Sequence, residues 1–240
     1  MCQLLPFINA LGHHGSTVDD AEKARKNQER LKGLLNPTTT AVLTMELQQG
    51  VVGEGALLPA LVERVAETGT VANAAAVCRA ARAAGARVVH CTAEHRADGA
   101  GATENCKIFA MGEKLRREQG VVPTEIGTPG AALVAELGPE PSDIVVARMH
   151  GMTPFMSTSL DQMLRNMGIA TIVATGVSVN VGILGLCINA VDLGYQVVLV
   201  RDAVAGLPAD YADAVIEHTL SMLATVTTAE EFSRVITGDR

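Results

Sequence analysis

The chain contains very few aromatic residues: they make up 2% of its 240 residues, and none is a tryptophan. Its core must therefore be built from aliphatic side chains, and a hydrophobic fraction of 48% is enough for one large domain. Positive charge is also scarce, because 19 Lys and Arg stand against 26 Asp and Glu, a formal net charge of −7. A general nucleic-acid binder needs a basic face, so nucleic acid is not an expected partner.

Long hydrophobic runs and paired cysteines are missing as well. No apolar stretch reaches the roughly 18–20 residues of a membrane helix, so we expect no membrane contact. Residues 1–12 are apolar but lack the basic start and the cleavage site of a signal peptide. The five cysteines are an odd number without CxxC spacing, which indicates reduced thiols in a cytoplasmic protein. They are Cys2, Cys78, Cys91, Cys106 and Cys187.

Strand and helix patterns alternate along most of the chain. Short apolar runs predict strands, and longer patterns of apolar and charged residues predict the helices between them. This alternation implies parallel pairing with right-handed crossovers, so we expect an α/β three-layer α/β/α fold with a six-stranded, mainly parallel sheet. The site should lie at the carboxyl ends of the strands. The predicted strands are residues 41–45, 87–92, 143–148, 170–175, 196–200 and 224–227, and the predicted helices are residues 57–84, 159–166, 181–193 and 208–222.

Two segments fall outside this alternation. Residues 13–36 are polar and predict an extra N-terminal helix at 19–35, with Ser16 or Thr17 as its cap. We assign residues 1–37 to an extension that packs on the core or on a partner subunit, and residues 38–240 to the main domain. Residues 93–130 lack a clear period. A long irregular segment beside strand ends is more often functional cover than filler, and the alternative is a disordered insertion.

Several blocks of the sequence resemble the isochorismatase-like cysteine hydrolases. Residues 175–195 resemble, without a gap, the segment that carries the nucleophile of that family. The resemblance covers roughly residues 38–232 and implies the Rossmann-like fold of that family. It also implies a homo-oligomer, a dimer or a tetramer, because members of the family usually are oligomers. The other matching blocks are residues 40–48, residues 127–131, residues 144–146, residues 190–202 and the Phe-x-x-Thr-x-Leu pattern at Phe155, Thr158 and Leu160.

The three positions of the family's catalytic unit are occupied differently here. Ordinary members use an aspartate, a lysine and a cysteine, whereas this chain has Glu46, Arg148 and Gly182. Glycine cannot form a thioester, and arginine stays cationic where a lysine could exchange a proton. Glu46 keeps the carboxylate. We therefore expect a buried acid–cation pair beside a small vacant space.

Three hypotheses about function follow. The first is a hydrolase that acts on a small molecule without a cysteine nucleophile, with Glu46 as acid or base and Arg148 binding or stabilising negative charge. Phenazine-pathway relatives also have glycine at this place and hydrolyse vinyl ethers by protonating the enol-ether carbon, so vinyl-ether hydrolysis is a candidate reaction. The second is a catalytically silent member that binds a small ligand or serves as an oligomeric scaffold. The third is a thiol enzyme that uses Cys91 or Cys106, since Cys187 should point into the core.

Two histidines are expected to contact the substrate. His150 lies two residues after Arg148, so it faces the same side if the strand continues. His95 follows the second predicted strand, near the place where nicotinamidase-like relatives have an Asp-x-His metal motif. The spacing and the second histidine of that motif are missing, so we predict no metal site, and no other cofactor is implied.

The turn after the fourth predicted strand is expected to bind substrate through its backbone. In the family, the peptide bond after the residue at Val177 is cis, and nearby amide N–H groups point at the oxyanion. The N–H groups of Val181 and Gly182 would then form an anion-binding helix N-terminus. The remaining residues expected to contact the substrate are Gln48, Phe155 and Ser178.

Overall fold

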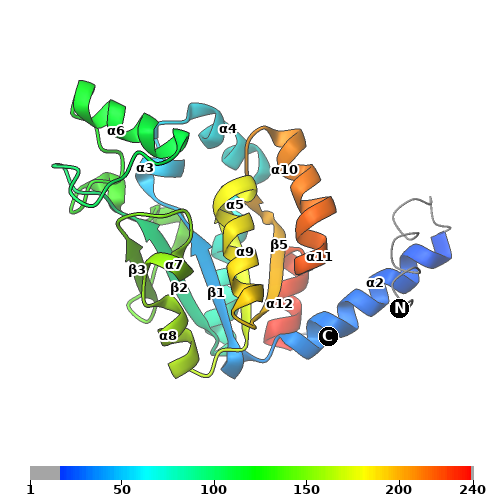
Figure 1. Ribbon diagram of the computed structural model, residues 1–240. Coiled ribbons are helices and arrows are strands. Elements are labelled where there is room, and N and C mark those ends of the chain that lie inside the picture. The colour runs from blue at the N-terminus through cyan, green and yellow to red at the C-terminus, as the bar shows by residue number, and fades with distance from the viewer. Residues whose placement is uncertain (1–16, 239–240) are drawn as a thin grey trace, which may run out of the picture.

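The computed structural model describes residues 17–238, and its centre is a sheet between two layers of helices (Figure 1). The sheet has six strands, all parallel, in the order β3-β2-β1-β4-β5-β6. This confirms the fold class predicted from the alternating pattern. The strands are β1 (Thr40–Met45), β2 (Arg87–Ala93), β3 (Ile144–Arg148), β4 (Thr171–Val177), β5 (Gln196–Ala205) and β6 (Thr225–Thr227).

Helices cover both faces of the sheet, which explains why its central strands are apolar without alternation. In β1, Val42 packs towards the layer that holds α5 and α12, whereas Leu43 and Met45 pack towards α8, α9 and α10. The helices are α2 (Thr17–Leu34), α3 (Gln49–Val52), α4 (Pro59–Thr68), α5 (Thr70–Ala84), α6 (Lys107–Gln119), α7 (Pro154–Ser157), α8 (Leu160–Asn166), α9 (Leu184–Asp192), α10 (Ala209–Val215), α11 (Ser221–Leu223) and α12 (Ala229–Thr237).

The long helix predicted over residues 57–84 is two helices, so that prediction was wrong. Gly69 separates α4 from α5 in a left-handed conformation, with φ 65°. Its N–H donates to the carbonyl of Ala66, which closes the end of α4. A glycine adopts this conformation without the steric cost that a Cβ brings.

Other boundaries also differ from the predictions. Strand β5 runs to Ala205, five residues beyond the predicted end at residue 200. The turn that precedes α9 is π-helical over Val179–Ile183, and a second π-helical turn, Ile216–Leu220, follows α10. The segment 93–130 contains α6, which no sequence period indicated. Its apolar pattern is weak because no residue of α6 is fully buried.

Helix α2 extends away from the body of the molecule, as Figure 1 shows. Its C-terminal part packs on the layer of α5 and α12, where Leu31 is completely buried. The Asn27 amide donates to the carbonyl of Val226 in β6 over 3.0 Å. Of the two proposed caps, Thr17 lies within the helix and Ser16 lies outside the described residues. None of the helices between residues 17 and 238 has the length and apolarity needed to cross a membrane.

Candidate active site

The carboxyl ends of β1 and β4 meet where the order of the strands reverses, the place where open α/β sheets form a crevice. Gly176 near the end of β4 allows this approach, because a Cβ there would lie 2.2 Å from the carbonyl oxygen of Met45. Glu46 follows directly on β1 with a positive φ of 53°, which is rare for a residue with a side chain. Such backbone conformations cluster at functional sites.

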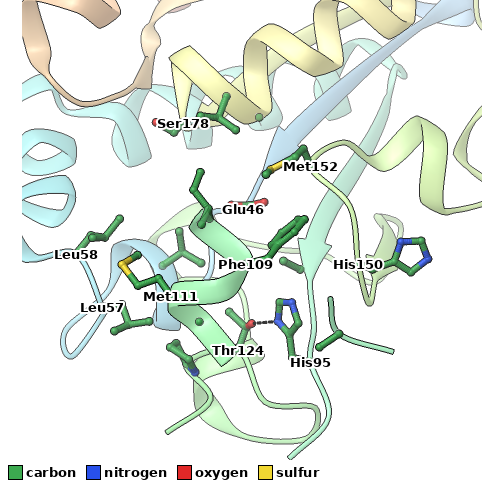
Figure 2. Close-up of a pocket in the computed structure, with 18 of the residues that line it drawn as sticks. Glu46, Leu57, Leu58, His95, Phe109, Met111, Thr124, His150, Met152 and Ser178 are labelled. Atoms are coloured by element: carbon green, nitrogen blue, oxygen red, sulfur yellow. Dashed lines mark hydrogen bonds between the residues drawn. The ribbon is translucent and has the colours of Figure 1, made fainter. Parts of the chain in front are cut away.

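A cavity of about 430 Å³ opens at this crevice (Figure 2). Eight of the ten residues that the sequence placed at the site line it, although they come from four strand ends and their loops. These eight are Glu46, His95, Arg148, His150, Val177, Ser178, Val181 and Gly182.

Glu46 and Arg148 form an ion pair at the cavity, so the expected acid–cation pair is present. The guanidinium of Arg148 uses three nitrogens: Nη2 donates to Glu46 Oε1, Nε to the carbonyl of Gly151 at 3.0 Å, and Nη1 to the carbonyl of Thr92 at 3.4 Å. The Arg148 side chain is 5% exposed and that of Glu46 is 22% exposed. Burial lowers the pKa of Arg148 to about 10, so the guanidinium still carries its charge at neutral pH.

Gly182 lies in the π-helical turn that follows β4. A Cβ at this position would lie 3.0 Å from the Met45 Cε and 3.2 Å from the carbonyl oxygen of Val177. The methyl group of Met45 therefore borders the place where a cysteine side chain would begin. The expected vacant space is partly filled, and a thiol would require the methionine side chain to shift.

The cysteines of residues 17–238 do not line the cavity. Cys91 and Cys187 are buried, and burial raises the pKa of each thiol to about 12. A thiol held in its neutral form is a poor nucleophile. Cys106 lies just before α6 and is partly exposed, but it does not reach the cavity wall either. Cys2 lies outside the described residues.

The turn after β4 has the backbone geometry that the resemblance implies, because the Val177–Ser178 peptide bond is cis. The Ser178 hydroxyl donates to Asn180 Oδ1 over 2.9 Å, and both residues line the cavity. The N–H of Val181 is engaged by the carbonyl of Ser178 at 3.1 Å. The Val181 N–H thus already has an acceptor within the turn, and an anion site formed by the N–H groups of Val181 and Gly182 stays a prediction.

The two histidines occupy different surroundings. His95 Nδ1 lies 2.9 Å from the Thr124 hydroxyl, and burial lowers its pKa while the charge of Glu113 acts in the opposite direction. His150 lines the cavity but is exposed, whereas Arg148 is buried. The strand ends at Arg148, so the condition under which both side chains would face the same side is not met.

Gln48 and Phe155 lie away from the cavity wall, which does not fit the expected substrate contacts. The Gln48 amide nitrogen donates to the carbonyls of Ala93 at 2.9 Å and Ala131 at 2.8 Å, and its oxygen accepts the N–H of Ala93. Gln48 thus holds the ends of β1 and β2 together. Phe155 is buried against Tyr195, with ring centroids 5.8 Å apart.

Much of the wall consists of apolar residues that the sequence did not indicate. They come from α6 and the residues just after it, from the loop before α4 and from the loop after β3, segments that meet only in the fold. The suggestion that residues 93–130 cover the site pointed to the right segment but to no particular residue in it. The main apolar contributors are Leu57, Leu58, Ile108, Phe109, Met111, Val121, Met149 and Met152.

The chain belongs to the isochorismatase family, because the family model of the Isochorismatase domain matches residues 40–231. The chain is similar to the ureidoacrylate amidohydrolase RutB of Agrobacterium fabrum, with 30% identity over 211 residues, which covers 84% of this chain and 92% of that protein. These findings confirm the resemblance noted in the sequence and place the chain among the hydrolases of this family.

Solved structures agree with this assignment. An isochorismatase family protein from Burkholderia thailandensis is 29% identical, with a TM-score of 0.68, and the match covers 84% of this chain and 97% of that one. A family protein from Desulfovibrio vulgaris is also 29% identical, with a TM-score of 0.69, and the match covers 82% of this chain and 98% of that one.

Within residues 17–238, no three His, Cys, Asp or Glu side chains are grouped so that they could hold a metal ion.

Proposed function

We propose that this family member hydrolyses a small molecule without a cysteine nucleophile, with Glu46 as the group that activates water. The observation that carries the proposal is the pair of Glu46 and Arg148 at the cavity wall, beside a glycine at the place of the nucleophile. The buried thiols of Cys91 and Cys187 support it, because they are neutral and lie away from the cavity.

The contact with Arg148 favours a basic role for Glu46. A neighbouring guanidinium stabilises the carboxylate form of an acid. A carboxylate accepts a proton from water, whereas vinyl-ether cleavage requires a carboxylic acid that donates one. Hydrolysis of an amide or ester bond therefore fits the pair better than vinyl-ether hydrolysis.

The proposed reaction has two steps. The oxygen of water attacks the carbonyl carbon of the substrate while Glu46 takes the water proton, and the carbonyl π electrons move to its oxygen. When the tetrahedral intermediate collapses, the carbonyl forms again and the bond to the amine or alcohol breaks. The nitrogen or oxygen of the leaving group takes the proton from Glu46 as this bond breaks. Arg148 holds Glu46 in place and stabilises negative charge that develops beside it. The name of the relative, an amidohydrolase, is compatible with an amide-type bond.

A turnover screen of the purified protein tests this proposal. Nicotinamide, ureido acids, other small amides and esters, and isochorismate-type vinyl ethers are incubated with the protein, and products are identified by mass spectrometry. We expect cleavage of an amide or an ester, and we expect the rate to survive alkylation of the thiols by iodoacetamide. Loss of the rate on alkylation would point to a thiol enzyme instead.

Two other outcomes of the screen would overturn the proposed reaction. Cleavage of a vinyl ether alone would require Glu46 to act as an acid. Absence of turnover with every substrate would favour the alternative, a catalytically silent member that binds a small ligand or serves as an oligomeric scaffold.

A further inference from the structure

The charged side chains of the cavity wall are already neutralised by one another. Among the described residues that line it, the two arginines are Arg148 and Arg116, and each is paired with a lining glutamate. Arg116 Nε donates to Glu113 over 2.9 Å. In Arg148, each of the three guanidinium nitrogens has an acceptor. The wall therefore offers no uncompensated arginine to an anionic ligand.

The histidines add little positive charge to the interior. Burial lowers the pKa of His95, so its imidazole is neutral at pH 7. His150 lines the cavity but is exposed to solvent. Neither residue gives the interior the fixed cation that would compensate a substrate carboxylate.

Much of the rest of the wall is apolar, and several of its apolar side chains are incompletely buried. Leu57, Leu58, Ile108 and Met111 all line the cavity, with exposed fractions from 42% to 54%. Figure 2 shows Leu57, Leu58 and Met111 beside the cavity, with Phe109 nearer to Glu46. Removing such apolar surface from water is favourable. A ligand with an apolar part would gain binding free energy here that a small polar acid could not.

We propose that the cavity takes an uncharged substrate with an apolar body, which packs between α6 and the Leu57–Leu58 loop and presents its hydrolysable group to Glu46. The position of the reacting group rests on the proposed function; the preference for neutral, apolar molecules does not. The volume of about 430 Å³ lies in the usual range for pockets that enclose small organic ligands.

Equilibrium binding of two matched ligand series tests the proposal without any need for turnover. One series is neutral (acetamide, butanamide and hexanamide), and the other carries a charge (acetate, butanoate and hexanoate). Calorimetric titration should show that amide affinity rises by roughly threefold to fourfold per added methylene. Hexanamide should bind at least about tenfold more tightly than hexanoate, because burying an unpaired carboxylate is costly. Affinity that is independent of chain length, or tighter binding of hexanoate, would overturn the proposal.

Two substitutions in the cavity wall test whether the apolar body of the ligand lies there. Leu58→Gln and Met111→Gln should weaken hexanamide binding severalfold and leave acetamide binding almost unchanged. Met222→Gln is the matched control, because Met222 is 70% exposed on α11 and does not line the cavity. Equal effects of all three variants on hexanamide would contradict the proposed position. Length-dependent amide binding without turnover would instead refute the proposed function and leave this inference standing.

Discussion

The proposed chemistry depends on how the side chain of a single residue, Arg148, is held. Its side chain is nearly inaccessible, and its positive charge is matched by Glu46 and two backbone carbonyls. Lysine could not replace this arrangement, because its single ammonium group cannot present three nitrogens in a fixed plane. The resemblance found Glu46, Arg148 and Gly182 because each stands at a recognisable strand end or turn. It could not find Met45 as the neighbour of Gly182, because that contact joins β1 to the turn after β4.

Removing Arg148 should destabilise the protein. In Arg148→Met, Glu46 loses its cation while its side chain remains only 22% exposed. We expect the free energy of unfolding to fall by about 1–3 kcal/mol, below the full cost of an entirely buried pair because water still reaches Glu46. Arg148→Lys keeps the charge and should cost less. Urea denaturation measures both values.

Arg87→Met serves as the control for these variants. Arg87 begins β2 and is exposed, so its loss should change the free energy of unfolding by no more than about 0.5 kcal/mol. If Arg148→Met lowers the free energy of unfolding by no more than the control does, the ion pair with Glu46 does not stabilise the fold.

At the scale of the element, the sequence predicted strands better than helices. The six strands were found because they are short apolar runs between two helical layers. Helix α6 was missed because it covers the cavity with one side and meets solvent with the other, so it lacks a buried face. The break at Gly69 was missed because α4 and α5 form a continuous pattern in sequence, and a single glycine is compatible with a helix interior. The apolar wall residues of the cavity could not be predicted, since they come from separate segments that meet only in the fold.

The left-handed conformation of Gly69 between α4 and α5 predicts that a side chain at this position destabilises the protein. Gly69→Ala should lower the free energy of unfolding by about 1–2 kcal/mol, because φ is positive there. Steric contact adds nothing, since the nearest atom to a new Cβ is Asn73 Nδ2 at 3.8 Å.

Gly33→Ala is the matched substitution within α2. A Cβ there would meet no atom within 4 Å, and alanine favours a helix by up to about 1 kcal/mol over glycine. In thermal unfolding, the melting temperature of Gly33→Ala should be higher than that of the wild type, and that of Gly69→Ala should be lower. A Gly69→Ala variant as stable as the wild type would indicate that α4 and α5 form a single continuous helix.

In the molecule as a whole, a buried polar network joins the neighbouring strands β1 and β2 to helix α5. His90 of β2 is fully buried, with Nδ1 at 2.8 Å from the Thr44 hydroxyl and Nε2 at 3.1 Å from Asp143. Asp143 also receives two hydrogen bonds from Arg82 of α5. Since a carboxylate only accepts, Nε2 carries the proton and Nδ1 accepts from Thr44. No sequence pattern indicated this network, because its members lie far apart along the chain.

This network makes the stability of the protein depend on pH. Burial lowers the pKa of His90, the charge and hydrogen bond of Asp143 oppose the shift, and Arg82 reinforces it. The unfolded chain therefore takes up a proton near pH 6.5 that the folded chain takes up only at lower pH. The stabilisation is complete above pH 6.5 and is lost as the pH falls below it, by up to about 1.4 kcal/mol per pH unit for one proton.

The slope of stability against pH tests this prediction, because it does not depend on the absolute cost of a substitution. Between pH 7 and pH 5, His90→Gln should show a smaller decrease in the free energy of unfolding than the wild type. His95 contributes in the same direction because its pKa is also lowered by burial, so part of the slope should remain. The lowered pKa of Asp143 acts only below its ordinary value of 3.8, outside this range. An unchanged slope in His90→Gln would contradict the prediction.

The hydrolysis rate of Glu46→Gln, on the substrate that the screen identifies, tests whether Glu46 activates water. We predict that the rate falls by about 10²-fold or more, because glutamine cannot accept a proton from water. Glu94→Gln is the control: Glu94 follows β2 and does not line the cavity, so its rate should equal that of the wild type. A cooperative thermal unfolding transition, measured for both variants, establishes that each is folded. A folded Glu46→Gln protein with the wild-type rate would contradict the account.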